Sequence, residues 1–311
     1  MVLKSIKDKF FKKSVNEDGG NGLFVTIDEL IAQRRYAYRW QTSQLNKFTS
    51  QNVGDVKSIF KGRGIEFEEI RAYEFGDDIR DIDWRVTARK QNPYTKIYAE
   101  EKDREVYVLL DLSPQMLFGT KKELKSVTAA KTAARIAWWS LKNKDRFGCV
   151  INDGKDIIML KAQNTQINMT MIFKKIADVT KNILNAPQDN LLSGQLKKAI
   201  AILEHIIKHK AIVFVISDFS DFSDETKKML ALLGKKASVS CINVFDILEK
   251  CPPVMGEYMV QQGNKKLVFS SSGSVFRKEY VSYFENKHNK IRDFCHKFNM
   301  KYIETNNDLM C

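Results

Sequence analysis

Two aspartates stand at the ends of short apolar runs, and their carboxylates are the groups best placed to bind a ligand. Asp111 ends the run 105–111, and Asp218 directly follows the run 211–217. Such runs are typical of strands covered on both faces, and the carboxyl ends of parallel strands share one edge of a sheet. We therefore expect both carboxylates at a common rim, where they and nearby hydroxyls could bind a hard cation such as Mg²⁺.

The remaining elements must build the sheet that brings these strand ends together. Further strands are expected at 146–151, 156–160, 237–245 and 301–304, and helices at 124–141, 166–184, 194–208, 224–234 and 274–298. The sequence 152–155 predicts a hairpin turn, and a second hairpin is expected around 262–264. Thr26 and Glu29 have the spacing of a capping box, which begins a helix from 27 to about 45. Strands that alternate with helices predict an α/β fold with a mainly parallel sheet.

Composition excludes several classes of protein. The 311 residues include 43% hydrophobic and 29% charged residues, which is the composition of a globular protein. The four histidines and five scattered cysteines lack the spacing of a zinc site. No apolar stretch reaches the ~20 residues of a spanning helix, so we expect a cytoplasmic protein, with peripheral membrane contact left open. The net charge of +13 keeps nucleic-acid binding as an alternative, although no long basic block or aromatic-basic motif accompanies it.

A segment of alternating charge surrounds Trp84. Its charged residues are Asp77, Asp78, Arg80, Asp81, Asp83, Arg85 and Arg89. One interpretation is a docking surface, because Trp and Arg are common interface anchors. The interpretation that we favour is a salt-bridged brace between two parts of the chain, with Trp84 as its buried apolar plug.

Two motifs carry a resemblance to known families. Asp111-x-Ser113-x-x-Met116 after a buried strand resembles the start of a von Willebrand factor A-type domain. Upstream, Arg71-x-Tyr73-x-x-Gly76-Asp77-Asp78 continues through Trp84 to Thr87-Ala88-Arg89, and this long motif resembles the bacterial family DUF58. The resemblance extends over roughly residues 25 to 305.

The resemblance implies a domain plan and a partner. It implies a von Willebrand factor A-like (Rossmann-like) domain over 104–311, an N-terminal family-specific extension over 23–103, and a flexible basic N-terminus and linker over 1–22. Arg71, Tyr73, Asp77, Asp78, Arg80, Asp83, Trp84 and Arg89 would then form the brace or the partner-binding surface. Members of the family are viewed as partners of a MoxR-type AAA+ ATPase, and no enzymatic activity is established for the family.

The resemblance also implies the ligands of a metal-ion-dependent adhesion site. The corresponding residues here are Asp111, Ser113, Gln115, Asn190 and Asp218, with Gln115 in place of a serine and Asn190 in place of a threonine. This degenerate set is expected either to bind Mg²⁺ or to hold no ion. In the second case the two aspartates cap loops and accept backbone N–H bonds.

We expect a non-catalytic adaptor that binds a MoxR-type ATPase or its client through the carboxyl-end loops of the sheet. If Mg²⁺ is bound, a partner carboxylate would complete its coordination. An Asp111→Ala variant is expected to fold normally but to lose the partner. The alternatives are a metal-dependent phosphohydrolase with Asp111 as nucleophile, and a basic nucleic-acid-binding protein. Ser113 stands where a haloacid-dehalogenase-type phosphohydrolase would need a second aspartate.

Overall fold

The computed structural model describes residues 21–40, 66–75, 77–99, 104–185, 194–208, 211–262 and 265–307. The chain divides into two compact units, one formed by residues 1–41 with 104–311 and the other by residues 42–103. Asn190, most of the linker 1–22 and the expected helix beyond residue 40 lie outside the described residues.

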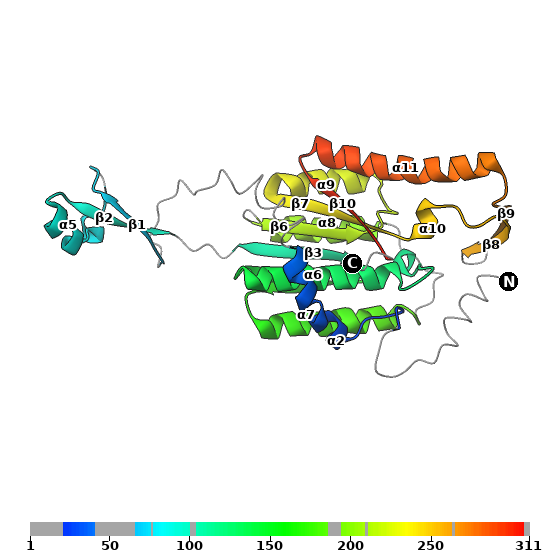
Figure 1. Cartoon of the computed structure of the whole chain (residues 1–311), viewed down its shortest axis with the longest axis horizontal. Coiled ribbons are helices and arrows are strands. Elements are labelled where there is room, and N and C mark those ends of the chain that lie inside the picture. The colour runs from blue at the N-terminus through cyan, green and yellow to red at the C-terminus, as the bar shows by residue number, and fades with distance from the viewer. Residues whose placement is uncertain are drawn as a thin grey trace. The chain divides into compact units, whose positions relative to one another are not determined.

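The larger unit contains a six-stranded sheet among its described residues (Figure 1). Its strands are β3 (Glu105–Asp111), β4 (Arg146–Asn152), β5 (Ile157–Gln163), β6 (Ala211–Ser217), β7 (Ala237–Phe245) and β10 (Lys301–Asn306). The order across the sheet is β10-β7-β6-β3-β4-β5, and β5 alone runs antiparallel to its neighbour. The predicted α/β fold with a mainly parallel sheet is confirmed. In chain order this arrangement is doubly wound, and the switch point lies between β3 and β6.

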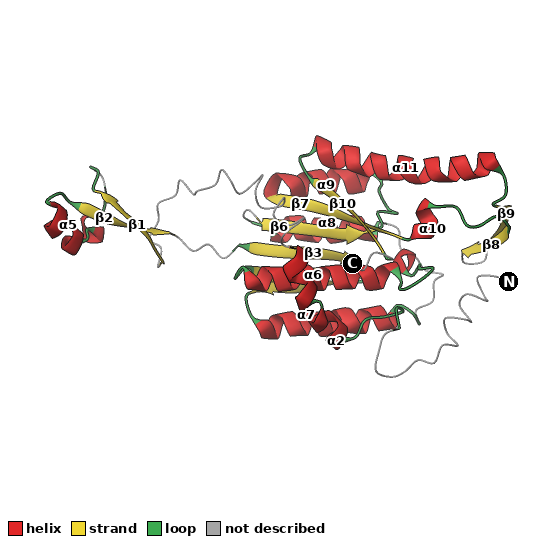
Figure 2. Cartoon of the chain, viewed as in Figure 1, coloured by secondary structure: helices red, strands yellow, loops and turns green. Residues whose placement is uncertain are grey.

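Helices cover both faces of this sheet, as Figure 2 shows. Alternate residues of β3 and β6, including Leu109 and Val213, pack into a core with α8 (Gln195–Ile206), α9 (Asp224–Lys236) and the end of α11 (Ser274–Lys297). On the opposite face, Phe214 meets Trp139 of α6 (Lys125–Lys142), with 6.3 Å between ring centroids. The helix α7 (Gln166–Asn182) packs against α6 on that side. The central strands β3 and β6 are almost wholly apolar because they are buried on both faces.

The N-terminal helices belong to the larger unit. The predicted capping box is confirmed: Thr26 and Glu29 exchange hydrogen bonds at the start of α2 (Ile27–Ala32). The helix is interrupted at Gln33, and α3 (Arg34–Trp40) follows. Trp138 on α6 donates a hydrogen bond to the backbone of Leu30 at 3.2 Å. These contacts place residues 23–40 with the 104–311 unit, whereas the sequence had grouped them with the extension 23–103.

The smaller unit contains a two-stranded antiparallel sheet and two short helices. The strands are β1 (Glu66–Ala72) and β2 (Tyr94–Ala99), and the helices are η2 (Ile79–Asp81) and α5 (Trp84–Lys90). The short elements and charged turns agree with the sequence pattern of this segment.

Beyond β7, the chain forms the elements that border the carboxyl edge of the sheet. The short helix α10 (Ile247–Lys250) comes first, followed by the antiparallel hairpin of β8 (Glu257–Gln262) and β9 (Lys265–Ser270). This is the hairpin predicted around 262–264. In the described residues, no helix combines the length and the apolar character needed to span a membrane.

Candidate functional site

The switch point brings Asp111 and Asp218 to the same edge of the sheet. β3 and β6 are hydrogen-bonded neighbours, and Leu110 lies opposite Ile216 just before the two acids. The expectation of a common rim is therefore confirmed. Both aspartates are only 4% exposed, however, so neither carboxylate lies open on the surface.

The carboxylate of Asp111 is held by three hydrogen bonds. Its Oδ1 accepts from the Ser113 backbone N–H at 3.0 Å and from Asn152 Nδ2 at 3.1 Å, and its Oδ2 accepts from Ser217 Oγ at 2.6 Å. Burial raises the pKa of Asp111, and the nearby negative charge of Asp218 adds to this effect, while the bond from Ser217 opposes it. Asp111 is thus a structural acceptor that joins three strand ends.

The predicted turn after β4 supplies one of these donors. Gly154 has a positive φ of 91°, and its N–H donates to Asn152 Oδ1 at 3.0 Å. A Cβ at this glycine would lie 2.5 Å from Pro114. The turn therefore needs glycine both for its backbone conformation and for its close packing, and it points the Asn152 amide toward Asp111.

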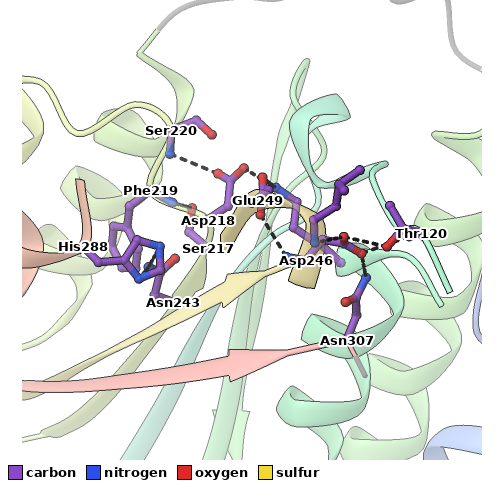
Figure 3. A network of polar contacts seen from close by, with 12 residues as sticks. Thr120, Ser217, Asp218, Phe219, Ser220, Asn243, Asp246, Glu249, His288 and Asn307 are labelled. Atoms are coloured by element: carbon purple, nitrogen blue, oxygen red, sulfur yellow. Dashed lines mark hydrogen bonds and ion pairs between the residues drawn. The ribbon is translucent and has the colours of Figure 1, made fainter. Parts of the chain in front are cut away.

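Asp218 is paired with Lys125, a residue that sequence reasoning did not select. Lys125 is the first residue of α6 and is 1% exposed. Its Nζ lies 2.8 Å from Asp218 Oδ2 and 2.9 Å from Glu249 Oε1. The other oxygen of Asp218 accepts from the Ser220 N–H at 3.0 Å. Figure 3 shows Asp218 and Glu249 side by side at the centre of this network.

Asp218 and Lys125 each stabilise the charged form of the other, which offsets the cost of burying both charges. Burial disfavours the carboxylate of Asp218, but attraction to Lys125, with a smaller contribution from Lys287, holds its pKa below the ordinary value. Burial likewise disfavours the ammonium of Lys125, and attraction to Asp218 and Glu249 raises its pKa above the ordinary value. Both groups are therefore charged across the physiological pH range.

A third buried acid, Asp246, fixes the loops around the pair of Asp218 and Lys125 (Figure 3). Asp246 is 0% exposed and forms a capping box with Glu249 at α10. It accepts from Thr120 N at 2.9 Å, Thr120 Oγ at 2.7 Å, Leu248 N at 2.8 Å and Asn307 Nδ2 at 2.6 Å. The spacing of Asp246 and Glu249 after a predicted strand was the sequence signal that could have identified this group.

The predicted metal ligands that the structure describes, which leaves out Asn190, do not form an open oxygen cage. Every carboxylate oxygen of Asp111 and Asp218 already accepts a hydrogen bond, and the Lys125 ammonium lies within 2.8 Å of Asp218. Ser113 is 8% exposed, whereas Gln115 on η3 (Pro114–Met116) is exposed. In the part of the chain that the structure describes, no three acidic, histidine or cysteine side chains converge as a metal site. These residues therefore do not fit a divalent cation.

A pocket of about 240 Å³ lies beside Asp218, between the end of β7, α10 and α11. Its walls include Asn243, Glu249, Tyr283, Phe284, Lys287 and His288. Asn243 is 1% exposed, and its Oδ1 has no hydrogen-bond partner among the described residues. Burial lowers the pKa of His288 despite its contact with Glu304. The pocket thus offers aromatic walls, with the charged side chains of Glu249 and Lys287 beside them.

In the smaller unit, the predicted charged residues form local bonds. Arg71 pairs with Asp77 at 2.7 Å, and the backbone N–H of Tyr73 donates to the carbonyl oxygen of Pro93. Asp78 caps η2 by accepting from the Arg80 N–H at 3.0 Å, and Asp83 caps α5 by accepting from the N–H groups of Arg85 and Val86. Arg89 lies exposed in the last turn of α5. Asp78 and Asp83 each cap the start of a helix, and this role explains their spacing without a binding partner.

Trp84 is not part of a core within its own unit. It is the first residue of α5, after the cap at Asp83, and its side chain is 68% exposed there. Phe75 and Ile79 are exposed as well. Whether the segment is a brace with Trp84 as its plug or a docking surface stays a prediction.

A Trp84→Ala substitution is therefore expected to leave stability almost unchanged. The free energy of unfolding should change by less than about 0.5 kcal/mol, since the ring is exposed. A buried plug would cost about 3–5 kcal/mol. Urea denaturation of the wild type and the variant measures the difference. A loss in the larger range would show that the Trp84 ring is packed in the folded protein.

Comparison with known proteins gives a family. The model of the family described as "Protein of unknown function DUF58" matches residues 69–290. The uncharacterized proteins Rv1480 of Mycobacterium tuberculosis and Mb1516 of Mycobacterium bovis are each 26% identical to the chain over 215 residues. The match covers 69% of this chain and 66% of each relative, so the chain spans slightly less than two thirds of their length.

Solved structures resemble the chain only distantly. The conserved hypothetical protein BatB from Bacteroides thetaiotaomicron is 15% identical with a TM-score of 0.41, and the match covers 66% of this chain and 91% of that one. An aerotolerance-related membrane protein from Bacteroides fragilis is 14% identical with a TM-score of 0.43 and coverage of 66% and 92%. A von Willebrand factor type A protein from Catenulispora acidiphila is 12% identical with a TM-score of 0.28 and coverage of 49% and 35%.

Proposed function

Since this chain belongs to the DUF58 family, whose function is unknown, we propose a function from the site itself: a non-catalytic module that binds a protein partner at the carboxyl edge of its sheet. The partner that we propose is a MoxR-type AAA+ ATPase or its client, which is the partner implied by the sequence motifs. The contact would be centred on the pocket between α10 and α11.

The observation that carries this proposal is the pocket with its aromatic walls. Its volume of about 240 Å³ lies below the roughly 300–1,000 Å³ of pockets for drug-sized ligands, so it suits a single side chain of a partner. Tyr283, at 74% exposure, gives it an aromatic rim. Aromatic side chains at the centre of a contact commonly carry most of its binding energy.

Exposed apolar side chains extend this surface beyond the pocket. Val254, Met255, Val268 and Val275 are each more than 60% exposed, on the loop before β8, on β9 and at the start of α11. The ring of Phe269 on β9 stacks on Phe276 of α11, with 5.2 Å between centroids. The hairpin and α11 therefore present one apolar surface, of the kind that marks interaction sites.

The state of Asp111 favours binding over catalysis. A nucleophilic carboxylate must reach its substrate. Asp111 is 4% exposed, and both of its oxygens accept hydrogen bonds from the protein. The buried, fully bonded carboxylate is suited to holding strand ends together.

A charge reversal at the pocket tests the proposal. Lys287→Glu should weaken binding of a purified MoxR-type ATPase from the same organism at least tenfold in calorimetry, because it places a like charge beside Glu249 and Asp218 inside the contact. Tyr283→Ala should weaken binding to a similar degree without affecting folding, because the ring is largely exposed.

The matched control is Lys174→Glu, an equal charge reversal at an exposed position of α7, which packs against α2, α6 and β4. This variant should bind the ATPase as the wild type does. Unchanged binding by Lys287→Glu and Tyr283→Ala would refute the pocket as the contact. Equal weakening by both charge reversals would indicate a nonspecific effect of net charge instead.

A further inference from the structure

We propose that the ammonium of Lys125 is a built-in cation, which supplies to this edge of the sheet the positive charge that the sequence motif assigns to Mg²⁺. The edge is then complete without a divalent ion. This inference concerns the charge and stability of the edge, and it holds whichever partner binds there.

The position of Lys125 is unfavourable by local rules. It is the first residue of an 18-residue helix, where the helix dipole disfavours a cation, and its side chain is almost wholly buried. Desolvation of an ammonium is costly unless close opposite charges offset it. A lysine here is therefore explained by its tertiary partners and not by helix formation.

Those partners come from two distant parts of the chain. Asp218 follows β6 and Glu249 lies on α10, and their oxygens are 2.8 and 2.9 Å from Nζ. The ring of Phe118 lies 5.9 Å from the same nitrogen. One ammonium thus joins the end of β6, the start of α6 and α10, which is the structural task of a bridging metal ion.

The ammonium of Lys125 and a divalent cation would compete for the carboxylate of Asp218. A cation that bound Asp218 would lie within a few ångströms of a buried positive group, and like charges repel strongly in a site of low polarity. Lys125 cannot leave easily, because its ammonium would lose both carboxylates. The wild-type protein should therefore gain no stability from Mg²⁺.

Removal of the lysine should reverse this behaviour. Lys125→Ala leaves two carboxylates facing a vacated space, and we expect its Tm to fall by about 10 °C. Millimolar Mg²⁺ or Mn²⁺ should then raise the Tm of the variant by several degrees, because an ion that binds only the folded state stabilises it. The Tm of the wild type should not respond to Mg²⁺, Mn²⁺ or EDTA.

The chain offers a matched control on the same helix. Lys131 is buried at 8% exposure and pairs with Glu123, but with no second carboxylate in an ion pair that the structure describes. Lys131→Ala should also lower the Tm, but Mg²⁺ should not restore it. Equal recovery of both variants would show a general salt effect and overturn the proposal.

A measurement on the wild type keeps the proposal testable even if Lys125→Ala does not fold. In calorimetry with Mg²⁺ and with Mn²⁺, the wild type and Asp218→Asn should give the same heats, because no ion binds at Asp218. Saturable binding that is lost in Asp218→Asn would overturn the proposal, because the metal and Lys125 would then share the site.

Discussion

Asp218→Asn should lower the free energy of unfolding by about 3 kcal/mol, whereas Asp111→Asn should change it by less than about 1 kcal/mol. The two aspartates end neighbouring strands and are equally buried, yet their partners differ. Asp218 faces the Lys125 ammonium at 2.8 Å, and its loss leaves a buried cation with Glu249 as its one remaining carboxylate in the described structure.

Asp111 meets only neutral donors in the described structure. In Asp111→Asn, the amide oxygen can keep the bonds from Ser113 and Asn152, and the amide nitrogen can donate to Ser217 Oγ. The substitution also removes a buried negative charge near Asp218. By contrast, Asp111→Ala would leave three buried donors without this acceptor, so we now expect this variant to be less stable than Asp111→Asn.

Urea denaturation at neutral pH measures both variants on one scale. If the two aspartates bound a metal ion together, stability would depend on both carboxylates. Similar losses of unfolding free energy in Asp218→Asn and Asp111→Asn would therefore contradict the assignment of Asp218 to Lys125. Similar stability of both variants and the wild type would show that the buried ion pair contributes nothing.

The pH dependence separates the same two groups. The folded pKa of Asp218 is lowered from 3.8, so its contribution is fully present above pH 3.8 and is lost as the pH falls through the lower, folded value. The folded pKa of Asp111 is raised from 3.8, so its protonated form is favoured in the fold and its contribution has the opposite sign. Acid unfolding of Asp218→Asn should therefore depend less steeply on pH than that of the wild type, whereas Asp111→Asn should steepen it.

Asp246→Asn should destabilise the protein by about 2–4 kcal/mol, although the side chain keeps its size. The carboxylate accepts four hydrogen bonds, from Thr120, Leu248 and Asn307. An amide nitrogen would face at least one backbone N–H in either orientation, so a buried donor would lose its acceptor.

The control for this substitution is Asp224→Asn. Like Asp246, Asp224 lies at the start of a helix, but its side chain is 86% exposed and pairs only with Lys227 in the described structure. Its loss should change the free energy of unfolding by no more than about 0.5 kcal/mol. Thermal or urea unfolding of the two variants decides the prediction, and an equally small effect at Asp246 would contradict it.

The sheet could be predicted from the sequence because the signals for its strands are local. Fully apolar runs such as 106–110 predicted buried strands, and the acids that follow them marked the edge where β3 and β6 meet. Lys125 was missed because a lysine in the first turn of a helix normally lies in solvent. Its partner Glu249 is 124 residues away, and no local pattern connects them.

Two other differences have the same origin. Residues 23–40 were grouped with the following segment by chain order, but the hydrogen bond from Trp138 to Leu30 shows that packing assigns them to the larger unit. Trp84 was expected to be an apolar plug because tryptophan is usually buried. Within its own unit it is exposed at the start of α5, so the plug stays a prediction about contact with another part of the chain or a partner.

The loop 118–124 is held from both sides. Leu124 N–H donates to Gly22 O at 2.8 Å, and Asn307 Nδ2 donates to Glu123 O at 2.8 Å, while Thr120 is bonded to Asp246. A loop with so many fixed points is already ordered before any encounter. A partner that docks here would lose its own conformational entropy while this chain loses little, so a small contact area can support a useful affinity.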